Sequence, residues 1–412
     1  MKKRAAALLL ALLMILPMAG CGVRAQELTK DIEPQALDTT TDLTAGGEAV
    51  TAFALSLLRS ERAATEGVLI SPVSVLNALG MVANGAGGDT LKQLETAAGM
   101  SLNQLNDFLY TYRMSLPAAC KSCTVSLANS AWVREDFRVE DDFLRSCVNY
   151  YGAEMYRSAF DGGLVTDLNR WVSKKTDGMI DRLLEQAPDV LTMLYMVNAA
   201  CFDARWDTPY TKADLRTGLP FTAANGTQQT ANYMTGTENI YLSGNNVTGF
   251  VKPYDGGKYA FVALLPDEGV TLEDYLENLT GEHLYKLITD HRSADVQVSI
   301  PKFDAQSELE LEEPLKDMGI TALFNVSTAD LRGIGSAPSG NNLYVSSVLH
   351  KTYLSLDESG TRAAAATVVE AVGDALPSED VKTVTLDRPF LYMIVDTHAC
   401  VPLFMGTVTS ME

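Results

Sequence analysis

The sequence predicts an α+β protein built around mixed or antiparallel sheets, and three observations lead to this class. Apolar residues at helical spacing dominate the first part of the chain, as in "AVTAFALSLLRS" and "TLKQLETAAG". Beyond residue 190 the pattern changes to short apolar runs that end at Pro, Gly or Asp, as expected for strands. Because helices precede strands without regular βαβ alternation, a doubly wound parallel sheet is not expected.

The individual elements follow this division along the chain. A strand is expected in "TVSLANSAWV", and "LNRWVSKKTDGMIDRLL" then returns to helical spacing. One further helical segment, "LEEPLKDMGITALF", interrupts the later strands. With no linker, low-complexity block or internal repeat, residues 45–412 are expected to form a single domain. The later strands are expected in "LYMVNAACF", "YAFVALLPDEG", "VQVSIPKF" and "LYMIVD".

Residues 1–20 have the features of a bacterial export signal. The basic start "MKKR" is followed by the apolar stretch Ala5–Pro17, which is too short to span a bilayer. The stretch ends in "LPMAGC", which resembles a lipobox and implies cleavage before Cys21 and acylation of its thiol. Met18 is unusual in a lipobox, so ordinary secretion with an incidental cysteine stays as the alternative.

The segment after the signal and the charge of the mature chain limit the kinds of partner. Residues 21–44 are rich in Thr, Asp and Ala and are expected to form a tether between the lipid and the domain. Removing residues 1–20 leaves 392 residues and changes the net charge from −20 to −23, because three basic residues are lost. Nucleic acid binding needs a basic surface, so it is not expected.

The cysteines do not form a disulfide scaffold. Five remain besides Cys21, and an odd number cannot all pair within one chain. Cys120 and Cys123 have the spacing of a redox or half-zinc motif, but there is no second such pair and no histidine pair at ligand spacing. We therefore expect two thiols or one local disulfide there, and no metal site.

No pattern of catalytic residues is found. The chain has four histidines and contains neither HExxH nor G-x-S-x-G, which argues against a zinc protease and an α/β-hydrolase. The glycines of "DGGKYA" lack the spacing and the Ser/Thr of a phosphate-binding loop. We expect a protein that is not an enzyme and that needs no cofactor.

The tract "DESGTRAAAATVVE" (residues 357–370) can be interpreted in two ways. Its four consecutive alanines favour a helix by intrinsic propensity. With a period of two, however, every second residue from Thr361 to Ala371 is uncharged and no larger than valine, whereas Arg362 and Glu370 fall on the opposite face. The second interpretation is a strand that can enter a tight slot on one side.

Ordered blocks along the chain resemble the serpins, the serine protease inhibitor family. The blocks begin with "GVLISPVSVLNALGMVANGAGGDT" (residues 67–90) and end with "VTLDRPFLYMI" (residues 384–394) and "PLFMGTV". The resemblance implies the serpin fold, with three β-sheets, about eight or nine helices and an exposed reactive-centre loop. The blocks between these ends are "LANSAWV", "LNRWVSKKTDGMI", "VNAACFDARW", "KPYDGGKYAFVALLPDEG", "VSIPKFDAQSELELEEPLKDMGI" and "LYVSSVLHKTYLSLDESGTRAAAAT".

The resemblance implies that the alanine-rich tract is the hinge of the reactive-centre loop, about residues 358–380. In this family a protease cleaves the loop and forms an acyl-enzyme, and the freed strand then inserts into the central sheet. Ser359 and Arg362 depart from the acidic residues common at their positions, and both changes are expected to be tolerated. The residues that match the hinge are Glu358, Gly360, Thr361, Ala363, Ala365 and Thr367.

Further residues match two family clusters that control insertion. Trp206 matches the tryptophan at the top of the sheet, the breach, where the loop first enters. Such residues also serve ordinary core packing and hydrogen bonding, and the two roles are compatible. Lys351 is expected to support the hinge strand. The polar cluster beneath the sheet, called the shutter, is matched by Ser71, Ser74, Asn198 and His350.

The residue before the cleaved bond should set the target, because its side chain fills the primary pocket of the protease. Counting fourteen positions from Gly360, as is usual in family loops, gives Asp374 followed by Ala375. An aspartate bait predicts a granzyme-like or caspase-like protease. Because the loop is somewhat long, Val372 and Leu376 stay as alternatives and would indicate an elastase-like or chymotrypsin-like target.

Three functions are compatible with some of these features. The resemblance implies a monomeric inhibitor that traps a serine, or a cysteine, endopeptidase covalently at the outer face of a bacterial membrane. A non-inhibitory serpin that binds a ligand or partner is the second possibility. Bulky or charged hinge residues are common in such proteins, and the alanine tract here argues against it. A surface solute-binding lipoprotein would explain Cys21 but not the ordered blocks.

Overall fold

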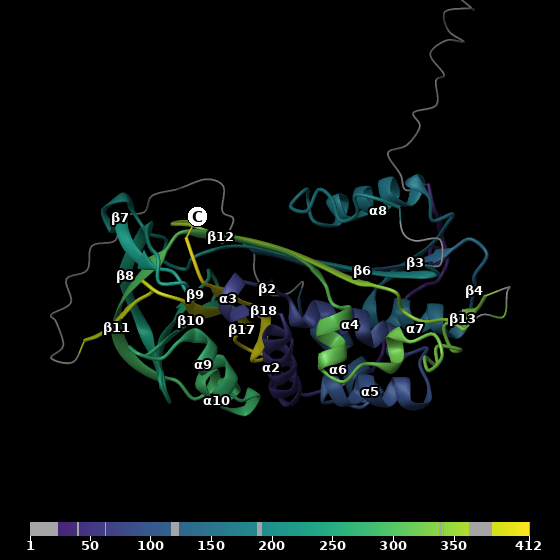
Figure 1. The fold of residues 1–412 in the computed structure, drawn as a ribbon, viewed down its shortest axis with the longest axis horizontal. Helices are drawn as coiled ribbons and strands as arrows, with labels where there is room; N and C mark the ends of the chain where they lie inside the picture. Colours follow the sequence, from purple (N-terminus) through teal and green to yellow (C-terminus); the bar gives the residue numbers. More distant parts are fainter. Residues whose placement is uncertain are drawn as a thin grey trace, which may run out of the picture.

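A seven-stranded central sheet runs along the length of the molecule (Figure 1). The computed structural model describes residues 24–38, 41–61, 63–116, 123–187, 192–337, 340, 342–361 and 381–411. In order across the sheet, the strands are β1 (Gln26–Glu27), β5 (Glu154–Ser158), β3 (Cys123–Arg134), β6 (Leu194–Arg205), β15 (Gly360–Thr361), β14 (Val348–Leu356) and β12 (Phe303–Glu310).

A second, nine-stranded sheet lies at one end of the central sheet, and a two-stranded ribbon of β4 (Arg138–Val139) and β13 (Gly335–Ser336) completes the β structure of the described residues. The second sheet has the order β16 (Lys382–Thr385), β11 (Arg292–Pro301), β8 (Gln228–Gly244), β9 (Val247–Pro253), β10 (Tyr259–Pro266), β17 (Phe390–Asp396), β18 (Val401–Val408) and β2 (Leu69–Ile70), with β7 (Leu215–Thr222) paired to β8.

Helices cover both faces of the central sheet. Helix α8 (Gly162–Lys175) lies on one face, and α4 (Pro72–Ala83) and its neighbours lie on the other (Figure 1). Within the described ranges, no helix is long and apolar enough to cross a membrane. The remaining helices are α2 (Leu43–Ser60), α3 (Ala63–Glu66), α5 (Gly88–Ala98), α6 (Leu102–Ser115), α7 (Asp141–Tyr151), α9 (Leu272–Asn278), α10 (Gly281–Thr289) and α11 (Glu312–Asp317).

Local sequence explains where several helices begin. The Asp42 side chain accepts a hydrogen bond from the Thr44 amide at 3.0 Å and caps α2. Ser101 and Gln104 form a capping box at the start of α6. Pro72 occupies the first turn of α4, where its missing N–H costs nothing. Every residue of α4 is buried, so this helix passes through the core.

The α+β class is confirmed, but two predicted helices end earlier than expected. The helix expected across residues 168–184 stops at Lys175, because Asp177 and Gly178 adopt positive φ angles of 48° and 71°. The helical segment expected over residues 311–324 is divided into α11 and a 3-10 turn at Ala322–Phe324. The break occurs at Gly319, where φ is 92°.

Helix α8 covers the outer face of the central sheet over β3 and β6. Its apolar side forms a separate hydrophobic cluster with the outer face of the central sheet. That cluster contains Val197 and Cys201 from β6 and Leu349 from β14, together with Leu164 and Leu168 of the helix. A strand that entered between β6 and β14 along their whole length would therefore pass along the edge of this cluster, between Val197 and Leu349.

The described part of the expected tether follows the surface of the domain. The Asp167 carboxylate accepts hydrogen bonds from the amides of Arg24 and Ala25 at 2.9 and 2.8 Å. Strand β1 then pairs with β5, and the Leu28 amide donates to Met155 at 2.7 Å. The segment thus lengthens the central sheet by one short strand at its β5 edge.

Replacing Asp167 with Ala should release this segment. Hydrogen bonds to charged groups contribute about 1.5–3 kcal/mol each, so we expect a lower thermal midpoint and faster hydrogen exchange at the amides of residues 24–28. Asp161→Ala, which removes the α8 N-cap instead, is the control and should leave exchange in residues 24–28 unchanged. Equal exchange in the two variants would contradict the assignment.

Candidate functional site

Strands β6 and β14 are paired along one part of their length and separated along the rest. They pair in parallel from Met196↔Val348 to Cys201↔Tyr353. Beyond that point β15 lies between them, antiparallel to both. Thr361 pairs with Ala204 on β6 and with Leu356 on β14. The first two residues of the predicted hinge strand therefore already occupy a position inside the central sheet.

Gly360 is required at this position by both its conformation and its surroundings. Its φ angle is 153°, which L side chains rarely adopt. A Cβ atom here would lie 2.1 Å from the carbonyl oxygen of Ala204. From its sequence context Gly360 is predicted to supply backbone freedom at a pivot, and the structure adds this close approach to the neighbouring strand.

The turn from Asp357 to Gly360 connects β14 to β15 and is held by its own hydrogen bonds. The Asp357 amide donates to the Gly360 carbonyl at 2.9 Å. The Asp357 carboxylate accepts from the Ser359 amide at 2.7 Å and from the Gly360 amide at 3.3 Å. This acidic residue thus stabilises the turn locally, as aspartates often do by bonding to backbone groups ahead of them.

Segment 206–210 adds three hydrogen bonds to successive carbonyl groups of this turn. The Trp206 indole donates to Asp357 at 2.9 Å, and the Trp206 amide donates to Ser359 at 3.0 Å. The Tyr210 amide donates to Glu358 at 2.9 Å. Trp206, which matches the breach tryptophan by its sequence block, therefore contacts the predicted hinge directly.

Glu358 also forms an ion pair from its side chain. Lys302, just before β12, donates to its carboxylate, and this hydrogen bond lowers the pKa of Glu358 below its usual value. Both side chains are partly exposed, so the contribution of the pair to stability is small. Glu358 therefore supports the turn mainly through its backbone carbonyl.

The Thr361 side chain points into the protein. Thr361 is completely buried, and its hydroxyl lies 2.6 Å from the Tyr254 hydroxyl. The Tyr254 ring stacks on Trp206, with ring centroids 4.5 Å apart and planes 13° from parallel. Because side chains alternate along a strand, residues two, four and six positions later would share this inward face.

The four residues assigned to the shutter lie together beneath the central sheet. Asn198 and His350 are directly paired across β6 and β14. The Ser71 amide, at the start of α4, donates to His350 Nε2 at 3.0 Å. Ser74 lies one turn further along α4 and, like the other three, is buried. The cluster therefore links the junction of β6 and β14 to the helix below.

Several polar atoms of the shutter have no hydrogen-bond partner among the described residues: Ser71 Oγ, Ser74 Oγ, Asn198 Oδ1 and His350 Nδ1. A buried polar group without a partner costs about 1–3 kcal/mol. Because Nε2 of His350 accepts a hydrogen bond, its ring is neutral with the proton on Nδ1. Burial is consistent with this state, since it lowers the pKa of His350 to about 4.

Residues beyond the predicted set also contribute to the site. Asn129 on β3 accepts a hydrogen bond from the Asn198 amide, and Tyr254 and Lys302 contact the hinge as described above. Asn129 and Tyr254 lie within blocks that resemble the family, so the blocks could have indicated them. Their individual roles depend on contacts between strands that are distant in sequence.

The remaining predicted positions lie outside the described residues. These are the rest of the hinge (Ala363, Ala365 and Thr367), the bait residues (Asp374 and Ala375, with Val372 and Leu376 as alternatives) and Cys21. Cys123 begins strand β3, whereas Cys120 lies outside the described residues. Within the described ranges, no group of three or more His, Cys, Asp or Glu side chains could hold a metal ion.

Comparison with known proteins identifies the family of this chain. The family described as Serpin (serine protease inhibitor) matches residues 48–411. Iripin-5 from Ixodes ricinus is 32% identical over 368 residues, which cover 86% of this chain and 92% of that protein. Leukocyte elastase inhibitor A from Rattus norvegicus is 30% identical over 375 residues, which cover 87% of this chain and 97% of that protein.

A solved structure gives the same result for the fold. The thermophilic serpin tengpin in its native state superimposes with a TM-score of 0.89 and 38% identity, covering 94% of this chain and 100% of that one. The latent state of the same protein superimposes less well, with a TM-score of 0.78. The expected α+β serpin fold with three sheets is thereby confirmed. This chain is a member of the serpin family.

Proposed function

We propose that this protein inhibits serine endopeptidases, or cysteine endopeptidases, by cleavage of its reactive-centre loop, covalent trapping and strand insertion. The observation that carries the proposal is the position of β15 between β6 and β14. A strand that extends from Thr361 in the same direction would replace the pairs between β6 and β14 one after another. The turn Asp357–Gly360 would not need to change for this extension.

The register of the two ladders favours such an extension. Continued from Thr361, the β6 and β14 registers both place Ala363 beside Phe202 and Leu354. Thr367 would fall beside Asn198 and His350, which are already paired with each other. The inserted strand would therefore enter without a shift in register. A shift by one residue would turn every side chain to the wrong face.

Small residues would suit the inward face of an inserted strand, because the side chains that would flank them are buried. Phe202, Leu354, Ala200 and Thr352, which would flank Ala363 and Ala365, are all buried. An alanine adds little volume in such surroundings, whereas a charged side chain would be buried without a partner. The two-residue period of the tract thus matches the face that Thr361 already presents to the core.

The shutter supplies a reason for insertion to be favourable. A threonine hydroxyl placed between Asn198 and His350 could bond to one of the polar atoms that lack partners there. One parallel ladder would also be replaced by two antiparallel ladders. Both changes lower the free energy of the inserted state, which is the driving force that the mechanism requires.

The covalent step requires only the chemistry of the target protease. Its serine oxygen attacks the carbonyl carbon of Asp374 and forms an ester. The peptide bond to Ala375 breaks, and the amine of Ala375 leaves with the proton that the serine gave up. Val372 or Leu376 would take the place of Asp374 if the register of the loop differs. The name of the relative leukocyte elastase inhibitor A supports an endopeptidase as the target class.

We further propose that the protein is exported, acylated at Cys21 and held as a monomer at the outer face of a bacterial membrane. The basic start, the short apolar stretch and the lipobox-like "LPMAGC" support this location. In this arrangement the protein would protect the cell surface from proteases in its surroundings.

The direct test is a protease panel of elastases, chymotrypsin, trypsin, a granzyme B-like enzyme and a caspase. Each mixture is denatured and separated by electrophoresis, and the released peptide is weighed by mass spectrometry. A complex that survives denaturation supports the proposal, and cleavage after Asp374 identifies the bait. Cleavage by panel members without any complex would instead favour the non-inhibitory binding function.

An exchange of two neighbouring residues tests the inward face without changing composition or net charge. In R362A/A363R the arginine moves from the outward to the inward face, beside buried Phe202 and Leu354. We expect this variant to be cleaved as a substrate, with at least about a tenfold loss of trapped complex, because insertion would bury an unpaired charge. R362A alone is the control and should inhibit like the wild type; equal inhibition by both variants would contradict the assigned face.

The neutral state of His350 predicts a pH dependence of stability. Its folded pKa of about 4 lies below the value of about 6.5 in an unfolded chain, so the unfolded state binds more protons between these values. From this group the free energy of unfolding falls by about 1.4 kcal/mol per pH unit as the pH drops through this range. His350→Gln keeps an acceptor for Ser71 but does not titrate, so its urea midpoint should change less between about pH 7 and about pH 5. An identical pH dependence in wild type and variant would rule out this role for His350.

A further inference from the structure

A buried ion pair lies directly behind the segment that holds the hinge turn. Lys252 on β9 and Glu238 on β8 are 2.7 Å apart, and their side chains are only 3% and 10% exposed. Burial raises the pKa of Glu238, while the lysine opposes this shift. Such a pair is costly to bury, and an apolar pair of similar size is often as stable or more stable. Its presence therefore calls for an explanation other than stability.

The Lys252 ammonium group contacts segment 206–210 at three places. It donates to the Thr208 carbonyl at 3.2 Å. It also lies 4.4 Å from the centre of the Tyr210 ring and 5.2 Å from the centre of the Trp206 ring, within the range of cation–π attraction. The ammonium group also donates to the Glu238 carboxylate, so Lys252 cannot turn toward solvent without breaking this ion pair.

The same two aromatic residues carry the hydrogen bonds to the hinge turn. The amide and indole of Trp206 and the amide of Tyr210 reach the carbonyl groups of Asp357, Glu358 and Ser359. A single buried cation thus contacts the segment that fixes the turn. The position of this turn determines the residue pair at which β15 begins to pair with β6.

We propose that Lys252 is a positioning residue for strand insertion. Held by Glu238, its ammonium group keeps segment 206–210, and with it the turn Asp357–Gly360, in the geometry from which the inserted strand extends. This inference rests on the proposed function. Without the cation, the turn would sample other geometries and the first pairs of the new ladder would form more slowly after the protease is acylated.

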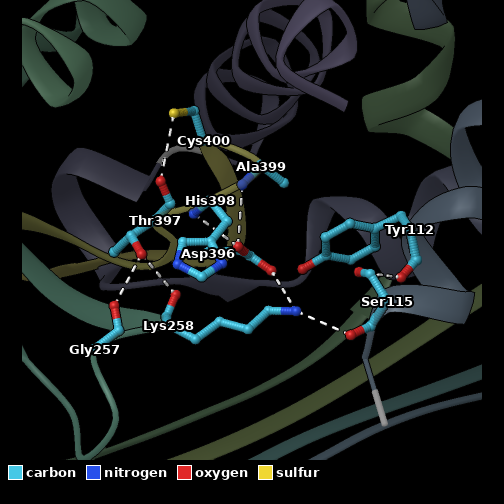
Figure 2. Close-up of polar contacts among 9 residues, drawn as sticks. All are labelled: Tyr112, Ser115, Gly257, Lys258, Asp396, Thr397, His398, Ala399 and Cys400. Carbon is cyan, nitrogen blue, oxygen red and sulfur yellow. Dashed lines mark hydrogen bonds and ion pairs between the residues drawn. The ribbon is translucent and has the colours of Figure 1, made fainter. Parts of the chain in front are cut away.

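The test compares Lys252→Met with a second buried lysine of the same kind. Figure 2 shows Lys258 between Asp396 and the Ser115 carbonyl, at 3.5 and 3.0 Å. Lys258 lies on the other side of the turn that joins β9 to β10. Its side chain is also buried and paired with a buried carboxylate. Lys258→Met therefore removes a similar ion pair but leaves the Lys252 contacts with Thr208, Trp206 and Tyr210 in place.

The readouts are the single-turnover rate of complex formation, the stoichiometry of inhibition and the thermal midpoint. Lys252→Met should slow trapping about tenfold, the change produced by a barrier higher by about 1.4 kcal/mol, and should raise the stoichiometry of inhibition. Lys258→Met should form the complex within about twofold of the wild-type rate, even if its thermal midpoint falls as much as that of Lys252→Met. Equal slowing in the two variants, or wild-type trapping by Lys252→Met, would overturn the proposal.

A third variant separates the missing cation from the carboxylate left behind. In K252M/E238Q neither charge is present, so the thermal midpoint should recover relative to Lys252→Met. Trapping should stay slow, because the contact with segment 206–210 is still missing. Recovery of both properties would assign the effect to the orphaned carboxylate and reject the role of Lys252.

A measurement without protease keeps this inference distinct from the proposed function. Hydrogen exchange at the Trp206 and Tyr210 amides should be faster in Lys252→Met and unchanged in Lys258→Met. If the wild type forms no complex with any protease, the proposed function fails and the role in insertion fails with it. If the wild type forms a complex but Lys252→Met changes neither trapping nor exchange, only the inference on Lys252 fails.

Discussion

The structure depends on an incomplete ladder between two parallel strands. Strands β6 and β14 bond to each other over part of their length, and the short strand β15 occupies the space where they separate. A backbone N–H or C=O buried in a sheet needs a partner, so this separation is possible only where another strand supplies one. The hinge turn, the breach and the shutter are all arranged around this single point of divergence.

Both ends of the junction contain polar groups in apolar surroundings. At the breach, the Trp206 indole and the amides of Trp206 and Tyr210 donate to the turn Asp357–Gly360 and fix one geometry. At the shutter, four polar atoms lack partners among the described residues. Bonded networks rigidify a core, whereas unpaired groups raise its free energy. The molecule thus combines a fixed starting point for a new strand with a region that a new strand would stabilise.

Much of this could be predicted from particular residues. The ordered blocks indicated the fold. The alternation from Thr361 onward predicted which face of the strand points inward, and the burial of Thr361 agrees with it. The ends of two helices were wrong, because left-handed residues at Asp177, Gly178 and Gly319 end them. Asp-Gly and Gly are residue types that commonly end helices, so these ends could have been predicted from the sequence. Asn129, Tyr254 and Lys302 were not singled out, because their roles arise only from neighbours on other strands.

The family, the order of helices and strands and the period of the hinge follow from the amino-acid sequence alone, because they depend on local patterns of apolar and small residues. The contacts that position the hinge do not. Lys252 and Glu238 meet because β8 and β9 are adjacent, and Trp206 reaches Asp357 across 151 positions of the chain. Such pairs are set by strand register and twist, which the whole sheet determines together, so only the folded protein brings these charges and rings to one place.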